Sequence, residues 1–326
     1  MRVALDAMGG DEAPKEIVKG ALRAIELYPE LEKIILVGKE EEIKKYLTRK
    51  EKKIEIVDAR EVIEMDDHPA IAYRKKKDAS ITIATKLVKE GKADAIISAG
   101  NTGGQMASSL FILGRIKGIS RPAIATPLPA IKGITLLLDS GANSDCSPEN
   151  LQQFALMGSI YAKKVLKREN PKVALLNIGS EKTKGNELTI KTYEILENME
   201  NINFVGNIEG REVPQGNVDV IVADGFVGNI VLKLSEGMGK AINTIIKDEI
   251  SKSFVRKLGA FLMKDVFIGL KKKMDYREIG GAPLLGVNGI SIICHGTSDS
   301  IAIHNAIRVA IRCKEEDYVE DIKNKL

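Results

Sequence analysis

The sequence has little of what several large classes of protein depend on. It contains no tryptophan, only 4% aromatic residues, and a formal net charge of only +4 over 326 residues. Without aromatic side chains to stack on bases, and without a large basic surplus, it does not have the composition of a nucleic-acid-binding protein. Its three cysteines, Cys146, Cys294 and Cys313, are widely spaced and odd in number, which fits neither a disulfide framework nor paired zinc ligands. We therefore expect a reducing, cytoplasmic compartment and no nucleic-acid partner.

Long hydrophobic runs are also missing. No run approaches the length needed to cross a bilayer, and Asp6 interrupts the apolar stretch that a signal peptide would need. There is no linker-like tract rich in Ser, Gly or Pro, and 44% hydrophobic with 29% charged residues is typical of an ordered globular protein. We expect one α/β unit over residues 1–326, with a division into two lobes as the alternative, and only peripheral contact with a membrane.

Short apolar runs alternate with helical patterns along most of the chain. The first run, 3–5, leads to a helix expected over 14–27. Further runs lie at 33–37, 53–57, 93–97, 172–176, 218–223 and 290–294. This alternation predicts an α/β fold with a mainly parallel, doubly wound sheet and helices on both faces. Residues 119–141 differ, because prolines punctuate two apolar runs with no helix between them, and we expect a hairpin or an antiparallel edge there.

Six apolar runs end in clusters rich in Gly, Asn, Ser, Thr or Asp. The clusters are 7–11, 98–104, 139–143, 177–180, 224–229 and 295–299. In an open α/β sheet such loops gather at the carboxyl edge of the strands, where ligands bind. Glycines let the backbone approach a ligand, and the N-terminus of a following helix favours an anion. One such loop is usually only a turn or a helix cap, but six together indicate a site for a phosphate or a carboxylate.

Motifs of the common cofactor and hydrolase sites are missing. No G-x-G-x-x-G follows a strand, and the glycines at 179 and 185 lack the spacing and the Lys-Ser/Thr of a P-loop. His-Glu-x-x-His and G-x-S-x-G are missing too, and the only histidines are His68, His295 and His304. The motifs therefore support neither NAD nor ATP as a cofactor, and they give no support to metal or serine-hydrolase chemistry.

Three ionisable residues lie in the polar loops. Lys182 and Lys184 belong to one loop, where an ammonium group can bind a phosphate or an oxyanion, the alternative being a solvated surface lysine. His295 directly follows the run 290–294, which places it at the end of a strand as a site residue or, alternatively, as a structural one.

In order and over nearly the whole chain, these loops resemble the phosphate acyltransferase (PlsX) family. The matching segments are ALDAMGGD (4–11), SAGNTG (98–103), RPAIAT (121–126), TKGNEL (183–188), ADGFVGN (223–229) and GGAPLLGVNG (280–289). The sequence departs from the family pattern at Gly104, Ser140, Ser180 and Lys182. The resemblance implies a fold similar to isocitrate and isopropylmalate dehydrogenases and to phosphotransacetylases. It also implies a homodimer, without cofactor or metal, that transfers a long-chain acyl group from acyl carrier protein to inorganic phosphate for phospholipid synthesis.

In such a reaction phosphate is itself the nucleophile, so the protein must bind it, aim it at the thioester and stabilise the oxyanion. We expect Lys184 to supply positive charge, Asn229 to donate from its amide, and His295 to act as the acid for the departing thiolate. The residues expected to bind substrate are Gly9, Gly10, Asn101, Thr102, Asn143 and Asp224. The open alternatives are a phosphotransacetylase-type enzyme that uses acyl-coenzyme A, a dehydrogenase of the same fold, and a non-enzymatic scaffold for carrier protein and membrane.

Two basic segments are candidate interaction surfaces. Segment 251–273 has seven basic residues and one acid, with an apolar stripe at helical spacing. It is expected either to form a helical hairpin packed on the core or at the dimer contact, or to project as a basic amphipathic element. In the second case it would bind an anionic membrane, at the inner face of the cell membrane and near a membrane glycerol-phosphate acyltransferase. The residues expected to contact the membrane are Phe254, Leu258, Phe261 and Leu262. Residues 74–77, Arg-Lys-Lys-Lys, form a candidate dock for the acidic carrier protein, or a solvated charge run.

Overall fold

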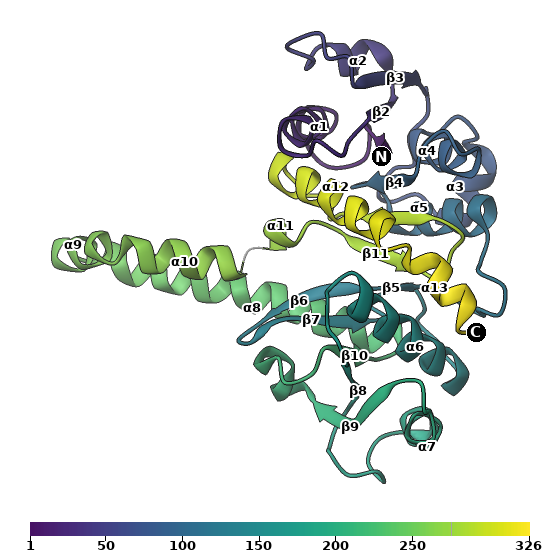
Figure 1. Cartoon of the computed structure of the whole chain (residues 1–326). Helices are drawn as coiled ribbons and strands as arrows, with labels where there is room; N and C mark the ends of the chain where they lie inside the picture. Colours follow the sequence, from purple (N-terminus) through teal and green to yellow (C-terminus); the bar gives the residue numbers. More distant parts are fainter. Residues whose placement is uncertain (275) are drawn as a thin grey trace.

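The computed structural model describes residues 1–274 and 276–326, which form two β-sheets with helices packed around them (Figure 1). The first sheet has the strand order β3-β2-β1-β4-β12-β11-β5, and the second β6-β7-β10-β8-β9. The strands of the first sheet are β1 Arg2–Asp6, β2 Lys33–Gly38, β3 Ile54–Asp58, β4 Ala95–Ser98, β5 Ala123–Ile124, β11 Ala282–Leu285 and β12 Ile290–Ile293. Those of the second are β6 Thr126–Ala130, β7 Gly133–Leu138, β8 Lys172–Asn177, β9 Asn203–Glu209 and β10 Val220–Val222. The predicted α/β class with mainly parallel pairing is confirmed, in two sheets rather than one.

Strand β1 shows why the predicted strands read as unbroken apolar runs. It pairs in parallel with β2 and β4 on its two sides. Val3 and Leu5 belong to the core that includes helix α1 Lys15–Leu27, whereas Ala4 packs on the other face with helix α4 Ser80–Lys89. Because helices cover both faces of the sheet, neither face is exposed to solvent, and successive residues of the strand are therefore all apolar.

Residues 119–141 form the predicted hairpin. Strands β6 and β7 pair antiparallel from Thr126 opposite Leu137 to Ala130 opposite Gly133, and β6 is the edge of its sheet. Pro127 therefore lies on an edge strand, where a missing N–H is tolerated. The chain passes from the first sheet to the second between β5 and β6, at Ala125.

One contiguous hydrophobic core includes residues of both sheets. It continues through helices α6 Pro148–Lys164, α12 Ser300–Glu315 and α13 Tyr318–Asn324. The rings of Tyr161 and Tyr318 meet edge-on in this core, with their centroids 5.6 Å apart. The remaining helices are α2 Glu40–Lys44, α3 Pro69–Lys75, α5 Thr102–Ser108, η1 Ser109–Leu113, α7 Glu187–Glu197, η2 Gly210–Gln215 and α11 Tyr276–Ile279.

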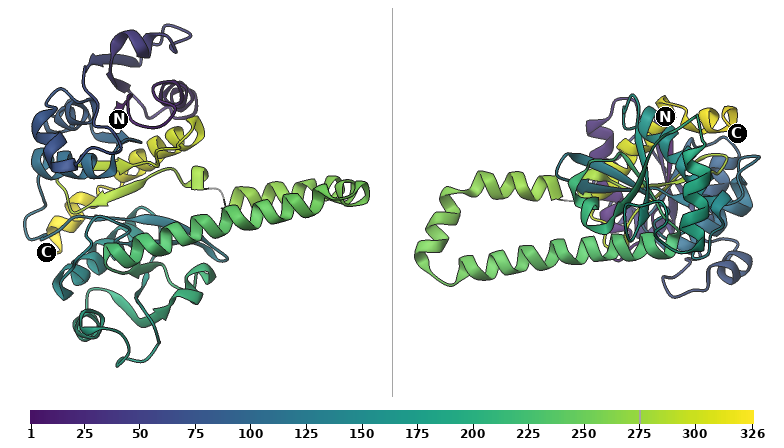
Figure 2. Two further views of the ribbon diagram at one scale, coloured as in Figure 1. Left: turned by 180° about the vertical axis from the view of Figure 1, so that it is seen from behind. Right: turned by 90° about the horizontal axis from the view of Figure 1, so that it is seen from below.

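A helical arm projects from this body (Figures 1 and 2). Helix α8 Gly225–Ser251 leaves the body, α9 Phe254–Leu262 forms the tip, and α10 Lys264–Met274 returns. No residue of α9 is buried, and Phe254 is 80% exposed. One of the arrangements expected from the sequence was packing of segment 251–273 on the core, and this prediction is wrong for the described part of the segment. The side chains of Lys271, Lys272 and Lys273 lie outside what the structure describes. None of the described helices is both long and apolar enough to span a membrane.

Candidate functional site

Three of the predicted loops meet at the carboxyl edge of the first sheet, after β1, β4 and β12. The backbone N–H of Asp11 donates to the carbonyl of Gly296 at 2.8 Å. Gly10 has φ +116°, and a Cβ on it would lie 3.2 Å from the Gly296 oxygen and 3.3 Å from the Ala99 Cβ. Loops 7–11, 98–104 and 295–299 therefore form one group, which we call the first loop cluster.

Beneath this cluster lies the buried carboxyl group of Asp6. It accepts hydrogen bonds from the hydroxyls of Ser80 and Ser98, both at 2.6 Å. Burial raises the pKa of Asp6, and these two hydrogen bonds oppose the shift. A Cβ on Gly9 would lie 2.5 Å from the Asp6 Oδ2 and 2.7 Å from the Gly100 nitrogen, so only glycine fits there. Asp6 was not predicted as a site residue, although an acid at the end of a buried strand and close before Gly9-Gly10 was a usable signal.

Asn101 and Thr102, both predicted to bind substrate, have different surroundings. The Asn101 side chain caps α5 by accepting from the Gly104 N–H at 2.8 Å, and it donates to the carbonyls of Glu64 at 2.8 Å and Met65 at 3.1 Å. At 7% exposure it holds two chain segments together. Thr102, the first residue of α5, is exposed.

His295 lies in the first loop cluster, immediately after β12 and Cys294. It is exposed, and its Nδ1 lies 2.8 Å from the Thr297 hydroxyl and accepts from the Thr297 N–H at 3.2 Å. These two contacts orient the imidazole ring on its own loop. Burial raises the pKa of the neighbouring Cys294 thiol to about 12, so this cysteine is a core residue and not a nucleophile.

A second group of loops follows β7, β8 and β10 at the carboxyl edge of the second sheet, again around a buried carboxyl group. Asp139 accepts from the backbone N–H groups of Ile124 at 3.0 Å, Ala142 at 3.0 Å and Asn143 at 2.7 Å. Burial raises the pKa of Asp139, and these donors oppose the shift. The Asn143 amide donates to Asp139 at 2.9 Å and to the Pro122 carbonyl at 2.8 Å. Asn143, predicted to bind substrate, thus has a side chain engaged in supporting the loop.

Helix α8 begins directly on this loop. Asp224 caps it by accepting from the Val227 N–H at 2.9 Å, so its predicted substrate-binding carboxylate is engaged within the helix. A Cβ on Gly228 would lie 1.9 Å from the Asp139 carbonyl oxygen, which shows how closely the helix approaches the strand end. As a result Asn229 lies over Gly141, whose Cβ would be 3.6 Å from the Asn229 Oδ1.

The half-buried Asn229 amide has no hydrogen-bond partner among residues 1–274 and 276–326. It is therefore open to a ligand at the start of α8, where unpaired N–H groups and the positive end of the helix dipole also lie.

The two lysines of the β8–α7 loop are placed differently. Lys182 forms an ion pair with Glu197 and lies 5.6 Å from the Tyr193 ring centroid, and the bond to Glu197 raises the pKa of Lys182. Lys184 is exposed and has no ion pair within the described part of the chain. Its backbone carbonyl accepts from the Asn177 amide at 2.9 Å, which fixes the loop at the end of β8.

We call loops 139–143, 177–186 and 224–229 the second loop cluster. It contains Lys184 and Asn229, whereas His295 lies in the first. Residues 122–126 connect the second cluster to strand β11 of the first sheet, because the Ala125 N–H donates to the Pro283 carbonyl at 3.0 Å and the Thr126 and Ser140 hydroxyls lie 2.6 Å apart. In the described chain no group of three or more His, Cys, Asp or Glu side chains could hold a metal ion.

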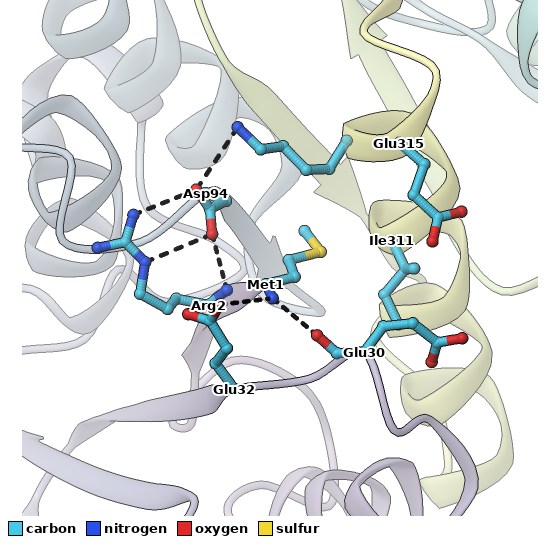
Figure 3. A pocket seen from close by; sticks show the side chains of 8 residues that line it. Met1, Arg2, Glu30, Glu32, Asp94, Ile311 and Glu315 are labelled. Atoms are coloured by element: carbon cyan, nitrogen blue, oxygen red, sulfur yellow. Dashed lines mark hydrogen bonds and ion pairs between the residues drawn. The ribbon is translucent and has the colours of Figure 1, made fainter.

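Two hollows lie away from these loops. A pocket of about 420 Å³ is lined by Met1, Arg2, Asp94 and Lys314, among others, where β1 and β4 begin (Figure 3). At its centre Asp94 accepts from the Arg2 N–H at 2.7 Å and lies 3.7 Å from the Lys314 ammonium. Burial raises the pKa of Asp94, but hydrogen bonds from Arg2 outweigh it and leave the pKa below its ordinary value. A second hollow of about 340 Å³ lies near the start of β8 and β9. Both are at the amino edges of the sheets, away from the loop clusters.

Several solved structures share this fold. The chain matches a phosphotransacetylase from Streptococcus pyogenes with a TM-score of 0.67 at 18% identity, covering 97% of this chain and 94% of that one. A branched-chain phosphotransacylase from Enterococcus faecalis matches with a TM-score of 0.61 at 14% identity, over 95% and 98% of the two chains. A 4-hydroxythreonine-4-phosphate dehydrogenase from Klebsiella pneumoniae gives 0.52 at 12%, over 96% and 97%. At these identities the likeness shows the fold alone, and it confirms the predicted fold class.

Sequence comparison is more specific. The family model described as "Fatty acid synthesis protein" matches residues 1–320. A phosphate acyltransferase from Desulfitobacterium hafniense is 58% identical, over 100% of this chain and 98% of the relative. Another from Thermoanaerobacter pseudethanolicus is 48% identical, over 100% and 97%. The resemblance noted from the loop motifs is thus confirmed, and the chain belongs to the phosphate acyltransferase family.

Proposed function

We propose that this protein transfers a long-chain fatty acyl group from acyl carrier protein to inorganic phosphate, giving an acyl phosphate for phospholipid synthesis. The observation that carries the proposal is 58% identity to a phosphate acyltransferase along the entire chain. The two clusters of glycine-rich loops support it, because they offer backbone donors and the exposed Lys184 ammonium to an anionic substrate.

Phosphate is proposed to bind at the second loop cluster. Lys184 supplies positive charge there, and no acid of the described chain competes for it. The unpartnered Asn229 amide and the first turn of α8 supply hydrogen-bond donors. Lys182 is excluded from this role because Glu197 and the Tyr193 ring already hold it.

The proposed reaction is a direct displacement without a covalent enzyme intermediate. A phosphate oxygen attacks the thioester carbonyl carbon, a C–O bond forms, and the carbonyl oxygen becomes an oxyanion. Lys184 and the Asn229 amide stabilise this oxyanion, and a donor of this kind contributes about 3 kcal/mol. The C–S bond then breaks and the thiolate leaves with the electron pair. A thiol of pKa about 8.5 leaves with little help, so proton donation by His295 is expected to contribute modestly.

The acyl thioester is proposed to lie along the first loop cluster. Gly10 offers half-buried backbone and Thr102 an exposed hydroxyl, whereas the buried Gly9 contributes by allowing the loop to pack closely on Asp6 and Gly100. The engaged side chains of Asn101, Asn143 and Asp224 contribute by fixing the shape of the loops. No cofactor or metal enters this scheme.

The arm is proposed to serve two contacts outside the site. Helix α8 exposes an apolar stripe at spacings of three and four residues: Ile230, Leu234, Met238, Ile242 and Ile245. We assign this stripe to the contact with a second copy of the chain in a homodimer. At the tip, α9 exposes Phe254, Leu258, Phe261 and Leu262 beside basic residues. This tip is proposed to bind the anionic inner face of the cell membrane, close to a membrane glycerol-phosphate acyltransferase.

The test is to mix the pure protein with palmitoyl-acyl carrier protein and inorganic phosphate and to trap acyl phosphate with hydroxylamine. Parallel reactions with palmitoyl-coenzyme A compare the two carriers. The proposal expects rapid formation of acyl phosphate from the carrier protein. A clear preference for the coenzyme A ester would favour a phosphotransacetylase-type enzyme, and binding without product would favour the scaffold.

A further inference from the structure

An exposed and a half-buried aromatic ring stack at the basic helix α3 on the body of the protein. Tyr73 of α3 and Phe111 of η1 stack with their ring centroids 5.0 Å apart and an interplanar angle of 19°. Phe111 is 60% exposed, so the stack is a surface feature and not a part of the core. The Lys77 ammonium lies 4.6 Å from the centroid of the Tyr73 ring. An apolar side chain of a partner can therefore pack on Phe111 while a cation lies next to it.

The positive charges around this stack are uncompensated. Arg74, Lys75 and Lys77 are exposed and form no ion pair with any described residue. Lys86 adds a fourth cation, since its ammonium donates to the Lys77 carbonyl at 3.3 Å. Lys76, by contrast, binds Asp67 at 2.5 Å and the Val62 carbonyl, so it belongs to the fold. On α1 and α2, by contrast, Lys15, Lys19 and Lys44 are paired with acids.

This surface adjoins the first loop cluster. A Cβ on Gly103 would lie 2.3 Å from the Cγ of Pro69, the first residue of α3. The segment before α3 is fixed to the same loop by the Asn101 amide. A Cβ on Gly296 would lie 3.3 Å from the Met65 Cε, so the segment also reaches the His295 loop. A partner on α3 would thus stand next to the proposed thioester site.

We propose that the α3–η1 face, defined as Tyr73, Arg74, Lys75, Lys77 and Phe111, is the docking surface for the acyl carrier protein. The inference rests on the proposed function, which supplies an acidic protein as the acyl donor. An acidic helix of the carrier meets the cations, and an apolar residue of that helix packs on the Phe111 ring. The carrier's thioester arm then enters the first loop cluster.

The position of the face favours a protein partner over the membrane. In all views the arm with α9 at its tip extends from one side of the body, while α3 and α4 lie on the opposite side (Figures 1 and 2). A bilayer in contact with α9 would not reach α3. The α3–η1 face is therefore left open to a carrier protein while the arm is at the membrane.

The test measures the Kd of acyl carrier protein, carrying its phosphopantetheine arm, for the full chain by calorimetry at two salt concentrations. The double variant Arg74→Glu/Lys75→Glu is expected to raise the Kd about tenfold or more and to flatten its salt dependence. Its matched control is Lys50→Glu/Lys52→Glu, the same charge change at exposed lysines that also lack an ion pair within the described chain. Phe111→Ala, which removes only a surface ring, should raise the Kd at both salt concentrations. Thermal unfolding checks that each variant is folded.

Equal Kd values for the wild type and the Arg74→Glu/Lys75→Glu variant would overturn the inference, as would an equal loss in the control. Loss of binding to anionic vesicles with carrier binding unchanged would assign the face to lipid and overturn it too. The proposed function is tested separately: a wild type that binds carrier through α3 yet forms no acyl phosphate would leave the dock standing and remove the activity.

Discussion

Replacing Gly228 by alanine tests whether the start of α8 positions the proposed site. The added Cβ would lie 1.9 Å from the Asp139 carbonyl oxygen and 3.0 Å from its carbon, whereas ordinary contact begins at 3.4 Å. The helix and the strand end must therefore separate by about 1.5 Å, and overpacking of this kind costs about 1–3 kcal/mol of stability. Because Asn229 is the next residue, its amide moves with the helix. A misplacement of about 1 Å at a reaction centre can lower the rate on the order of 100-fold.

The assay combines thermal unfolding with steady-state acyl phosphate formation well below the unfolding temperature of the variant. Gly237→Ala is the matched control, because it lies on the same helix with nothing within 4 Å of its Cβ. That change should stabilise the helix by about 0.5–1 kcal/mol and leave kcat/KM unaltered. A folded Gly228→Ala variant with the kcat/KM of the wild type would refute the reasoning, since the close approach of α8 to Asp139 would then not matter to catalysis.

Three further predictions follow from single contacts. Lys184→Ala should lower turnover by about 100-fold or more. Lys182→Ala should cost little stability and little activity, because the ion pair of Lys182 with Glu197 is exposed to solvent. Equal losses for the two variants in the acyl phosphate assay would show that the wrong lysine was chosen. Replacing Leu258 and Phe261 together by glutamate should abolish co-flotation of the protein with anionic vesicles. The body should stay folded, since neither residue is buried. If the double variant instead dissociates a dimer, α9 belongs to the subunit contact. Folding lowers the pKa of Asp94 from its ordinary value of 3.8. The ionised carboxylate therefore stabilises the folded protein above pH 3.8, and this stabilisation is lost as the pH falls through the pKa of the folded state. Asp94→Asn should therefore lower the unfolding temperature at neutral pH, and the difference from the wild type should vanish in strong acid. If scanning calorimetry found the same difference in strong acid as at neutral pH, this prediction would be contradicted.

The sequence predicted those parts of the fold that local pattern encodes. Residues 3–5 and 33–37 lie within β1 and β2, because strands covered on both faces must be apolar throughout. Prolines marked the β6–β7 hairpin, since they cannot lie in the middle of a sheet. In contrast, β11 was missed: it pairs antiparallel with β5, more than a hundred residues earlier in the chain, and no local pattern encodes such a contact.

The projecting helix was also missed over most of its length. Residues 230–245 of α8 carry an apolar stripe of the kind that usually faces a core. Periodicity alone cannot distinguish a stripe that packs within the chain from one that is left for a partner. Only the tip segment, with its excess of basic residues, stood out as an element that could project.

The loops of the site were predictable, but the roles of their side chains were not. Asn101 and Asp224 are residue types that serve equally well as ligands for a substrate and as helix caps, and the structure engages both as caps. The positions of Asp6 and Asp139 beneath the site were not predicted, because an acidic residue at the end of a strand is usually interpreted as part of a turn. Their burial beneath glycine-rich loops depends on the tertiary fold.

The central claim is that phosphate attacks the thioester directly. It is tested most directly by measuring, in one reaction, the carrier thiol released and the acyl phosphate formed, with and without inorganic phosphate. The account predicts one acyl phosphate for each thiol and no thiol release when phosphate is omitted. Release of about one thiol per protein without phosphate, together with an acyl adduct in the mass spectrum of the protein, would contradict direct attack and show a covalent enzyme intermediate.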